Sequence, residues 1–201
     1  NNSQKGLSKI YLCFLPFLLI ITRKLELVVK PRMWAEEATV HLHESFESTI
    51  LEMLFFIPHW EGYFCFNRNL VIVILKLFPI EYAAIITTWA GFLIQLIPHL
   101  IIICSDQKIW GNNLRKLLLS TAIIIIPIGT GETWLNTTCS HYHLGVLSFI
   151  ILLDAIELKT NWKKYVYSII LFVCALSSPV GCFMLIGYTY GGLFLKLAIS
   201  K

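Results

Sequence analysis

The residues best suited to chemistry in this sequence gather in one short stretch, 130–144. It contains a carboxyl, an amide, two imidazoles and a thiol, which belong to Glu132, Asn136, His141, His143 and Cys139. Almost wholly apolar segments lie on both sides of it, at 117–128 and 145–153. Ionisable groups at a membrane boundary are costly unless they face water, protein or substrate. We therefore expect a functional site at one mouth of a membrane bundle.

Glu132 and Asn136 are four residues apart, and they would share a face if the stretch were helical. On a shared face the two side chains could form a hydrogen bond. His141 follows near the start of the next apolar segment and is a further candidate for ligand contact.

Two carboxylates follow Trp34 in the first long polar segment. Glu36 and Glu37 could serve as general base, metal ligand or sugar-binding group. The structural alternative is an exposed helix start, because the helix dipole favours acidic residues in the first turn.

A second polar cluster at 58–69 mixes aromatic and charged side chains. Trp60 and Tyr63 could stack on a sugar or on the edge of a lipid. Arg68 stands directly before an apolar run and could hold a lipid phosphate through its fork of donors. Equally, Trp and Tyr favour the headgroup region, so the cluster could be an interfacial belt.

Alternating histidines occur at His41 and His43, and again at His141 and His143. Together with Cys139 they could bind zinc, which takes nitrogen and sulfur ligands. Ligands two positions apart do not share a helix face, however, and the two segments are distant in sequence. We therefore interpret them as separate polar histidines at a water interface and assign no metal site.

The composition indicates a membrane protein. The 201 residues are 57% hydrophobic and only 14% charged, and the mean hydropathy is +0.72. A soluble domain would carry about 25% charged residues. The net charge of +4 is scattered without a basic patch, which excludes a nucleic-acid partner.

The hydrophobic pattern predicts an all-α protein, a polytopic transmembrane bundle of about six spans. The expected spans are 7–22, 80–104, 114–128, 142–156, 165–176 and 180–197. The run at 69–78 is too short to cross and should be an interfacial or re-entrant helix.

The orientation follows from lysine and arginine in the short loops. The loops 105–116 and 157–164 are basic, whereas 130–140 and 177–179 carry no basic residue. The first pair should be cytoplasmic, together with the N-terminus. The segments 23–79, 130–140 and 177–179 should then meet on the outer face. The sequence thus predicts one transmembrane domain over 1–201, made of a first span (1–22), an outer loop with interfacial helices (23–79) and the remaining spans (80–201). Asp154 should be a solvated residue at the cytoplasmic end of its span.

Five ordered motifs resemble bacterial multi-span membrane proteins of the GT-C glycosyltransferase-like superfamily. They are Trp-Ala-Glu-Glu (34–37), Pro-x-x-Glu-Gly-Tyr with a later Asn-Arg (58–68), Phe-Pro-Ile-Glu-Tyr-Ala (78–83), Gly-Glu-Thr-Trp-Leu-Asn-Thr-Thr-Cys-Ser-His-Tyr (131–142) and Leu-Ser-Ser-Pro-Val (176–180). The sequence departs from the family pattern at Cys139, Tyr142 and Ser178, where Asn, Trp and Gly are usual.

The resemblance implies an enzyme that transfers a sugar from a polyprenyl-phosphate carrier to a cell-envelope acceptor on the outer face of the bacterial plasma membrane. Glu36 or Glu37 would be the catalytic base, in some members together with a divalent metal. Arg68 would stabilise the leaving phosphate, while Trp34, Trp60, Tyr63, Glu132, Asn136 and His141 would contact substrate. The alternatives are a transporter or flippase of a lipid-linked glycan and a non-catalytic membrane protein. We expect the chain to be a fragment of a longer protein, truncated at its C-terminus.

Overall fold

The computed structural model describes residues 2–59, 61–125, 134–156 and 161–199, and every regular element among them is helical. The expected all-α class is confirmed. The elements are α1 (Asn2–Arg23), α2 (Leu25–Val29), the π-helix η1 (Glu37–Leu42), α3 (His43–Glu47), α4 (Ile50–Leu54), α5 (Phe66–Leu75), the 3-10 helix η2 (Ile80–Tyr82), α6 (Ala83–Cys104), the 3-10 helix η3 (Lys108–Trp110), α7 (Asn113–Ile125), α8 (Ser140–Ala155), α9 (Asn161–Ala175) and α10 (Pro179–Ile199).

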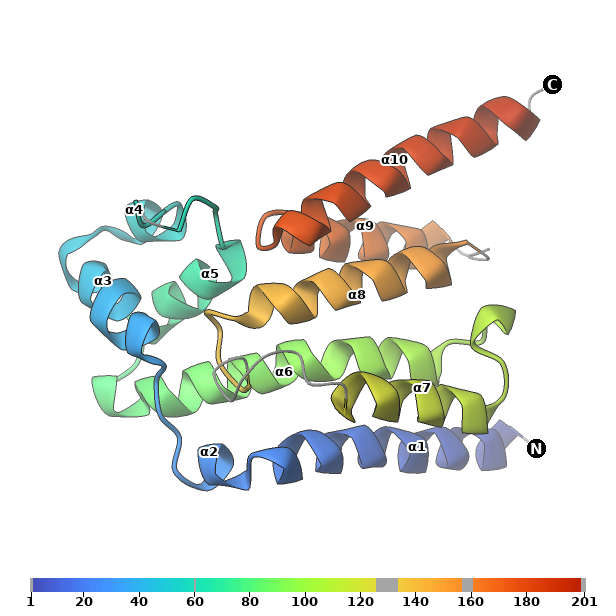
Figure 1. The fold of residues 1–201 in the computed structure, drawn as a ribbon, viewed down its shortest axis with the longest axis horizontal. Helices are drawn as coiled ribbons and strands as arrows, with labels where there is room; N and C mark the ends of the chain where they lie inside the picture. The colour runs from blue at the N-terminus through green and yellow to red at the C-terminus, as the bar shows by residue number, and fades with distance from the viewer. Residues whose placement is uncertain (1, 60, 126–133, 157–160, 200–201) are drawn as a thin grey trace.

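The helices α1, α6, α7, α8, α9 and α10 run back and forth between two ends of the molecule, with α10 slanting away from the rest (Figure 1). Helix α6 contacts α1 and α7 on one side and α8 on the other, and α8 in turn contacts α9 and α10. Along the chain, these six long helices occur in the same order as the six apolar segments expected from the sequence. By length and composition, one helix in the described part, Ile80–Cys104, could cross a membrane. Membrane crossing by the other five stays a prediction.

One end of the bundle carries most of the irregular chain and is called the loop-rich end below. It comprises residues 24–82, 134–139 and 176–178, and the short helices α2 to α5 gather there (Figure 1). The expected short helices between the first two long ones are therefore present. Helix α4 begins with a capping box, in which Thr49 and Glu52 satisfy each other's main-chain N–H groups.

Helix α5 begins at Phe66, before the apolar run expected at 69–78. The three polar residues Asn67, Arg68 and Asn69 are buried in its first turn and find partners outside the helix. The main-chain N–H of Asn67 donates to Ser177 Oγ at 2.9 Å, and Asn69 Nδ2 donates to the carbonyl of Phe56 at 2.8 Å. Sequence hydrophobicity did not reveal these partners.

The three segments expected on one face, 23–79 (the first), 130–140 (the second) and 177–179 (the third), do meet. Asn67 joins the first segment to the third through Ser177 and to the second through Ser140, to which its Nδ2 donates at 2.5 Å. Glu37 joins the first segment to the second through the main-chain N–H of Thr137. Hydrogen bonds between residues this far apart show that the three segments meet, whereas their place on the outer side of a membrane stays a prediction.

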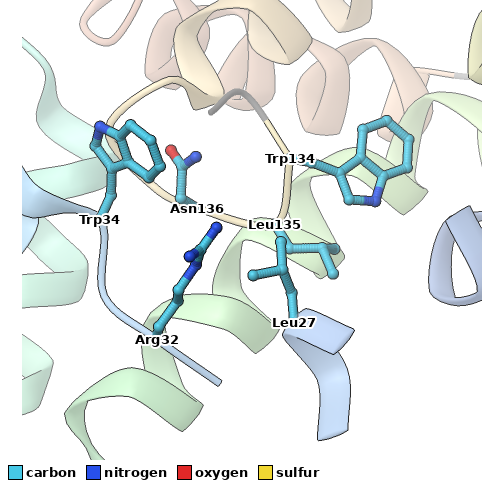
Figure 2. A pocket seen from close by; sticks show the side chains of 6 residues that line it. All are labelled: Leu27, Arg32, Trp34, Trp134, Leu135 and Asn136. Atoms are coloured by element: carbon cyan, nitrogen blue, oxygen red, sulfur yellow. The ribbon is translucent and has the colours of Figure 1, made fainter. Parts of the chain in front are cut away.

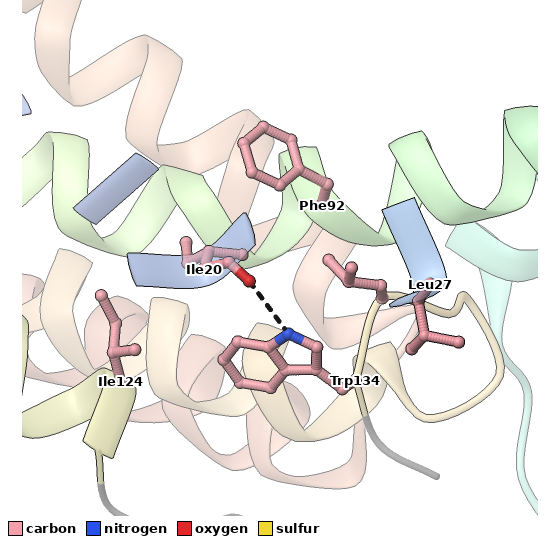
Figure 3. Packing of buried hydrophobic residues seen from close by; sticks show 6 residues of the cluster. Ile20, Leu27, Phe92, Ile124 and Trp134 are labelled. Atoms are coloured by element: carbon pink, nitrogen blue, oxygen red, sulfur yellow. Dashed lines mark hydrogen bonds between the residues drawn. The ribbon is translucent and has the colours of Figure 1, made fainter. Parts of the chain in front are cut away.

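An apolar cluster anchors the second segment to the bundle (Figure 3). Trp134 packs with Ile20 of α1 and Phe92 of α6, and its indole N–H donates to the carbonyl of Ile20 at 3.2 Å. The guanidinium of Arg23 lies 4.4 Å from the centre of the Trp134 ring, as in a cation–π contact. Residues 134–136 are thereby fixed against α1 and α6.

The opposite end corrects the expectation for Asp154. Its side chain is buried rather than solvated, and it accepts hydrogen bonds from Ser105 Oγ, from Trp110 Nε1 at 2.6 Å and from the Tyr167 hydroxyl at 2.7 Å. These donors come from the 105–110 loop and from α9. The carboxyl group therefore joins three segments, as a buried polar group needs hydrogen-bond partners when water cannot solvate it.

Candidate functional site

The π-helix η1 is the unusual backbone element of the loop-rich end. Such helices are rare and often occur at functional sites, because their wider turn changes the direction of side chains. In η1, Glu37 and His41 are both completely buried, whereas the preceding Glu36 is exposed. The two neighbouring glutamates therefore have opposite environments.

The carboxylate of Glu37 is saturated with hydrogen bonds. Its Oε1 accepts from the main-chain N–H and the hydroxyl of Thr137 and from the N–H of Thr138, at 2.5, 2.6 and 3.2 Å. Its Oε2 accepts from the N–H of Trp34 at 2.9 Å. A carboxylate held in this way is suited to fixing two loops together. Glu36, which faces outward, is the better placed of the two to accept a proton from a substrate.

A small pocket lies where the first and second segments meet (Figure 2). Its enclosed volume is only about 10 Å³, room for about one water molecule, and it is lined by Leu27, Arg32, Trp34, Trp134, Leu135 and Asn136. Trp34 and Asn136, both predicted from the sequence as substrate contacts, thus line one pocket. The structure adds Arg32, an exposed cation that was not singled out from the sequence.

The pocket wall depends on a close approach between backbones. Leu135 has a φ of +53°, a left-handed conformation that is uncommon for a residue with a side chain. Gly91 of α6 lies directly beneath, and a Cβ atom there would lie 2.6 Å from the N atom of Asn136. Glycine at position 91 is what allows the loop to lie against α6.

Arg68 occupies a buried ion cluster rather than an open site. Its guanidinium is fully buried, and Nη1 and Nη2 donate to the two carboxylate oxygens of Glu61 at 2.5 and 2.7 Å. His41 Nε2 lies 3.5 Å from Glu61 Oε1. The phosphate partner suggested by the sequence is therefore replaced by a carboxylate from within the chain.

The cluster shifts the protonation of its members. Burial alone would raise the pKa of Glu61, but the contacts with His41 and Arg68 outweigh burial and lower that pKa to about 2. Burial lowers the pKa of His41 below its ordinary value, and Arg68 lowers it further against the opposing effect of Glu61. The stable state at neutral pH is an ionised Glu61–Arg68 pair beside a neutral imidazole.

Tyr63 and His141, both predicted as substrate contacts, lie against each other. The Tyr63 hydroxyl is 3.3 Å from His141 Nδ1, and the same nitrogen is 3.1 Å from the carbonyl of Thr138. Burial, followed by the negative charge of Glu61, raises the pKa of Tyr63 to about 12. The pair joins the 61–69 segment to the start of α8.

A second hollow lies beside η1 and has a volume of about 300 Å³. Its lining residues are Thr39, Val40, His43, Glu44, Phe56, Pro58 and His59. Histidine and glutamate line it together, yet no three His, Cys, Asp or Glu side chains group as a metal ion would require anywhere in the described part of the chain. The structure thus brings Trp34 and Asn136 to one pocket, where Glu37 joins their two segments, and Tyr63, Arg68 and His141 to a neighbouring cluster. Glu36 is exposed and does not line the pocket. Trp60 and Glu132 lie outside the described residues.

Two residues important to this geometry were not assigned from the sequence. Arg32 had a weak signal, since it stands two residues before Trp34 in a basic stretch. Glu61 belonged to a motif that was noted, but its role as the partner of Arg68 required the tertiary fold.

Comparison with protein-family models, with curated proteins and with solved structures finds no match.

Proposed function

We propose that this chain is a multi-pass membrane protein of the GT-C glycosyltransferase type, which transfers a sugar from a polyprenyl-phosphate carrier to a cell-envelope acceptor. The observation that carries the proposal is the lining of the small surface pocket, which brings together the cation of Arg32, the indole of Trp34 and the amide of Asn136. These groups suit a phosphate, a sugar ring and a sugar hydroxyl respectively.

The membrane part of the proposal rests on the exposed apolar side chains of the long helices. Phe14, Leu93, Phe149, Phe172 and Phe183 are each more than half exposed and come from α1, α6, α8, α9 and α10. Lipid would cover such surfaces without a protein partner. The loop-rich end would then lie at the outer surface, as the distribution of basic residues predicts.

In the proposed reaction Glu36 accepts the proton of the acceptor hydroxyl as its oxygen attacks the anomeric carbon. The bond between that carbon and the phosphate oxygen breaks, and polyprenyl phosphate leaves with inversion at the carbon. Arg32 replaces Arg68 in stabilising the leaving phosphate, because the guanidinium of Arg68 is already paired with Glu61. Glu37 holds the pocket loops together. Among the described residues no three His, Cys, Asp or Glu side chains group together, and no step is assigned to a metal ion.

The decisive experiment is a transfer assay with the purified chain, a synthetic polyprenyl-phosphate sugar and an envelope glycan acceptor. Glu36→Gln should lower turnover by about 100-fold or more, the usual contribution of a general base. Glu47→Gln, which changes another exposed glutamate on α3, is the matched control and should leave turnover unchanged. Equal activity of Glu36→Gln and the wild type would exclude Glu36 as the base.

A specific observation also supports a carrier of lipid-linked glycans as the second candidate. Buried polar side chains extend along the bundle interior from one end to the other; they include Thr87, Gln95 and His99 of α6, Ser120 of α7, and Ser148 and Asp154 of α8. Polar residues inside a membrane bundle often mark a substrate path. The test follows a fluorescent lipid-linked glycan as it crosses the membrane of vesicles that contain the chain. Transport that is unaffected by Glu36→Gln would favour this alternative over the enzyme.

A further inference from the structure

Two cysteines from distant parts of the sequence face each other at the end of the bundle opposite the loop-rich end. Cys13 Sγ of α1 and Cys104 Sγ of α6 are 3.8 Å apart. A disulfide bond is about 2.05 Å long, so the two sulfur atoms must approach each other by about 1.8 Å to bond. We propose that Cys13 and Cys104 form a redox-sensitive thiol pair that closes into a disulfide between α1 and α6.

The surroundings hold the two helix ends in register. Lys9 Nζ, one turn before Cys13 on α1, donates to the carbonyl of Cys104 at 3.4 Å and to Asp106 Oδ1 at 2.7 Å. These contacts fix the start of α1 against the end of α6. They also place the Lys9 ammonium beside the main chain of Cys104.

Access differs between the two thiols in a way that suits stepwise oxidation. Cys104 is exposed and is the last residue of α6, whereas Cys13 is partly buried within α1. A small disulfide from solution would therefore reach Cys104 first. The buried Cys65 and Cys174 are less accessible, and the exposed Cys182 lies on α10.

The reaction is a thiol–disulfide exchange with a low-molecular-weight disulfide as oxidant. The Cys104 thiolate attacks one sulfur of the oxidant, forms a mixed disulfide and releases one small thiol. The Cys13 thiol loses its proton to water and attacks Cys104 Sγ, which releases the second small thiol. The protein is oxidised by two electrons, and one molecule of the external disulfide is reduced to two thiols.

The predicted orientation places this pair on the cytoplasmic side, where thiols are normally kept reduced. The disulfide would then form under oxidising stress and reopen afterwards. Since Ile20 and Arg23 of α1 also contact Trp134, the bond would restrain the helix that supports the candidate site. The inference itself does not depend on the proposed function.

The test is oxidation of the purified full chain in detergent with oxidised glutathione, followed by proteolysis and mass spectrometry. Trypsin should yield residues 10–23 joined to 77–108, and dithiothreitol should separate them. The midpoint of thermal unfolding should rise on oxidation and return on reduction. A wild-type digest that lacks the joined peptides after oxidation would overturn the proposal.

Serine variants provide matched controls. Cys13→Ser and Cys104→Ser should each abolish the joined peptides and the rise in unfolding temperature, whereas Cys182→Ser should retain both. A rise in unfolding temperature that persists in Cys104→Ser would show that another thiol is responsible and would also overturn the proposal. Because the wild-type peptide map decides independently, a variant that fails to fold does not prevent the test.

Discussion

Thr137 donates both its main-chain N–H and its hydroxyl to one carboxylate oxygen of Glu37, a residue 100 positions earlier, at 2.5 and 2.6 Å. Glu37 is completely buried, and its second oxygen accepts from the N–H of Trp34. One side chain therefore fixes the segment before the π-helix to the loop before α8. Those two segments carry Trp34 and Asn136 of the pocket.

Loss of the Glu37 hydrogen-bond acceptors should destabilise the protein strongly. In Glu37→Gln the new amide group would face N–H donors, so that at least one buried donor loses its acceptor. We expect the free energy of unfolding to fall by about 3 kcal/mol, as for other buried hydrogen bonds to charged groups. Denaturant titration in detergent measures this, with the exposed Glu47→Gln as control. Equal losses for the two variants would contradict the role of Glu37.

The Glu61–Arg68 pair should contribute far more to the free energy of unfolding than the exposed pair between Lys9 and Asp106. Glu61→Gln leaves the buried guanidinium without a counter-charge, which typically costs about 3–5 kcal/mol. Asp106→Asn removes a partner whose side chain is 79% exposed, and should cost less than about 1 kcal/mol. Denaturant titration of both variants tests the contrast. Similar losses would show that the Glu61–Arg68 pair is solvated.

Protonation of His41 should weaken the fold as the pH falls. Because burial lowers its pKa in the folded state, the unfolded chain binds the proton more readily below the ordinary pKa of about 6.5. Stability should therefore decrease from about pH 6.5 downward, as far as the lowered pKa of the folded protein. His41 faces Glu61 and Arg68, and the charge of Glu36 also acts on its pKa, in the raising direction. The pKa of Glu61, about 2, confines its own contribution to more acidic conditions, between about 4.5 and 2.

Unfolding free energies measured between pH 7.5 and 5 provide the test for His41. The neutral variant His41→Gln should show a shallower decline than the wild type over this interval. Parallel curves would mean that another group titrates. His43→Gln, which changes an exposed histidine two residues further on, is the matched control and should retain the wild-type slope.

Gly91→Ala should disturb the pocket. The added methyl group would lie 2.6 Å from the Asn136 main chain, which the Trp134 cluster prevents from moving freely. We expect a loss of about 1–3 kcal/mol in unfolding free energy, as in other overpacked sites. Gly187→Ala on α10 is the control: no atom lies within 4 Å of its added Cβ, and alanine favours a helix. That variant should be neutral or more stable by about 0.5–1 kcal/mol. Equal stability of Gly91→Ala and the wild type would contradict the close approach.

Arg32→Gln should weaken phosphate binding without weakening the fold. A hydrogen bond to a charged group contributes about 1.5–3 kcal/mol, which corresponds to roughly a 10- to 100-fold loss of affinity. Titration with a short-chain polyprenyl phosphate, followed by calorimetry, measures it. Lys30→Gln, two residues away and also exposed, should bind normally. If both variants lose affinity equally, the effect is general electrostatic attraction rather than a specific contact.

The sequence by itself determined the all-α class, the order of the long helices and the gathering of three polar segments at one end. These properties follow from the length of apolar runs and from loop composition, which are local and can be summed along the chain. The short helices between the first two long ones also followed from such local patterns. The roles of Trp34 and Asn136 as substrate contacts come from the family resemblance of their motifs and stay a prediction.

The tertiary structure alone decided which of the polar residues are partners. Glu36 and Glu37 are adjacent and chemically identical, yet one is exposed and the other is buried against Thr137. Arg68 pairs with Glu61, and the cation at the pocket is Arg32. Asp154 joins three segments instead of facing water. Burial and pairing depend on contacts between residues far apart in sequence, so local hydrophobicity and spacing do not determine them.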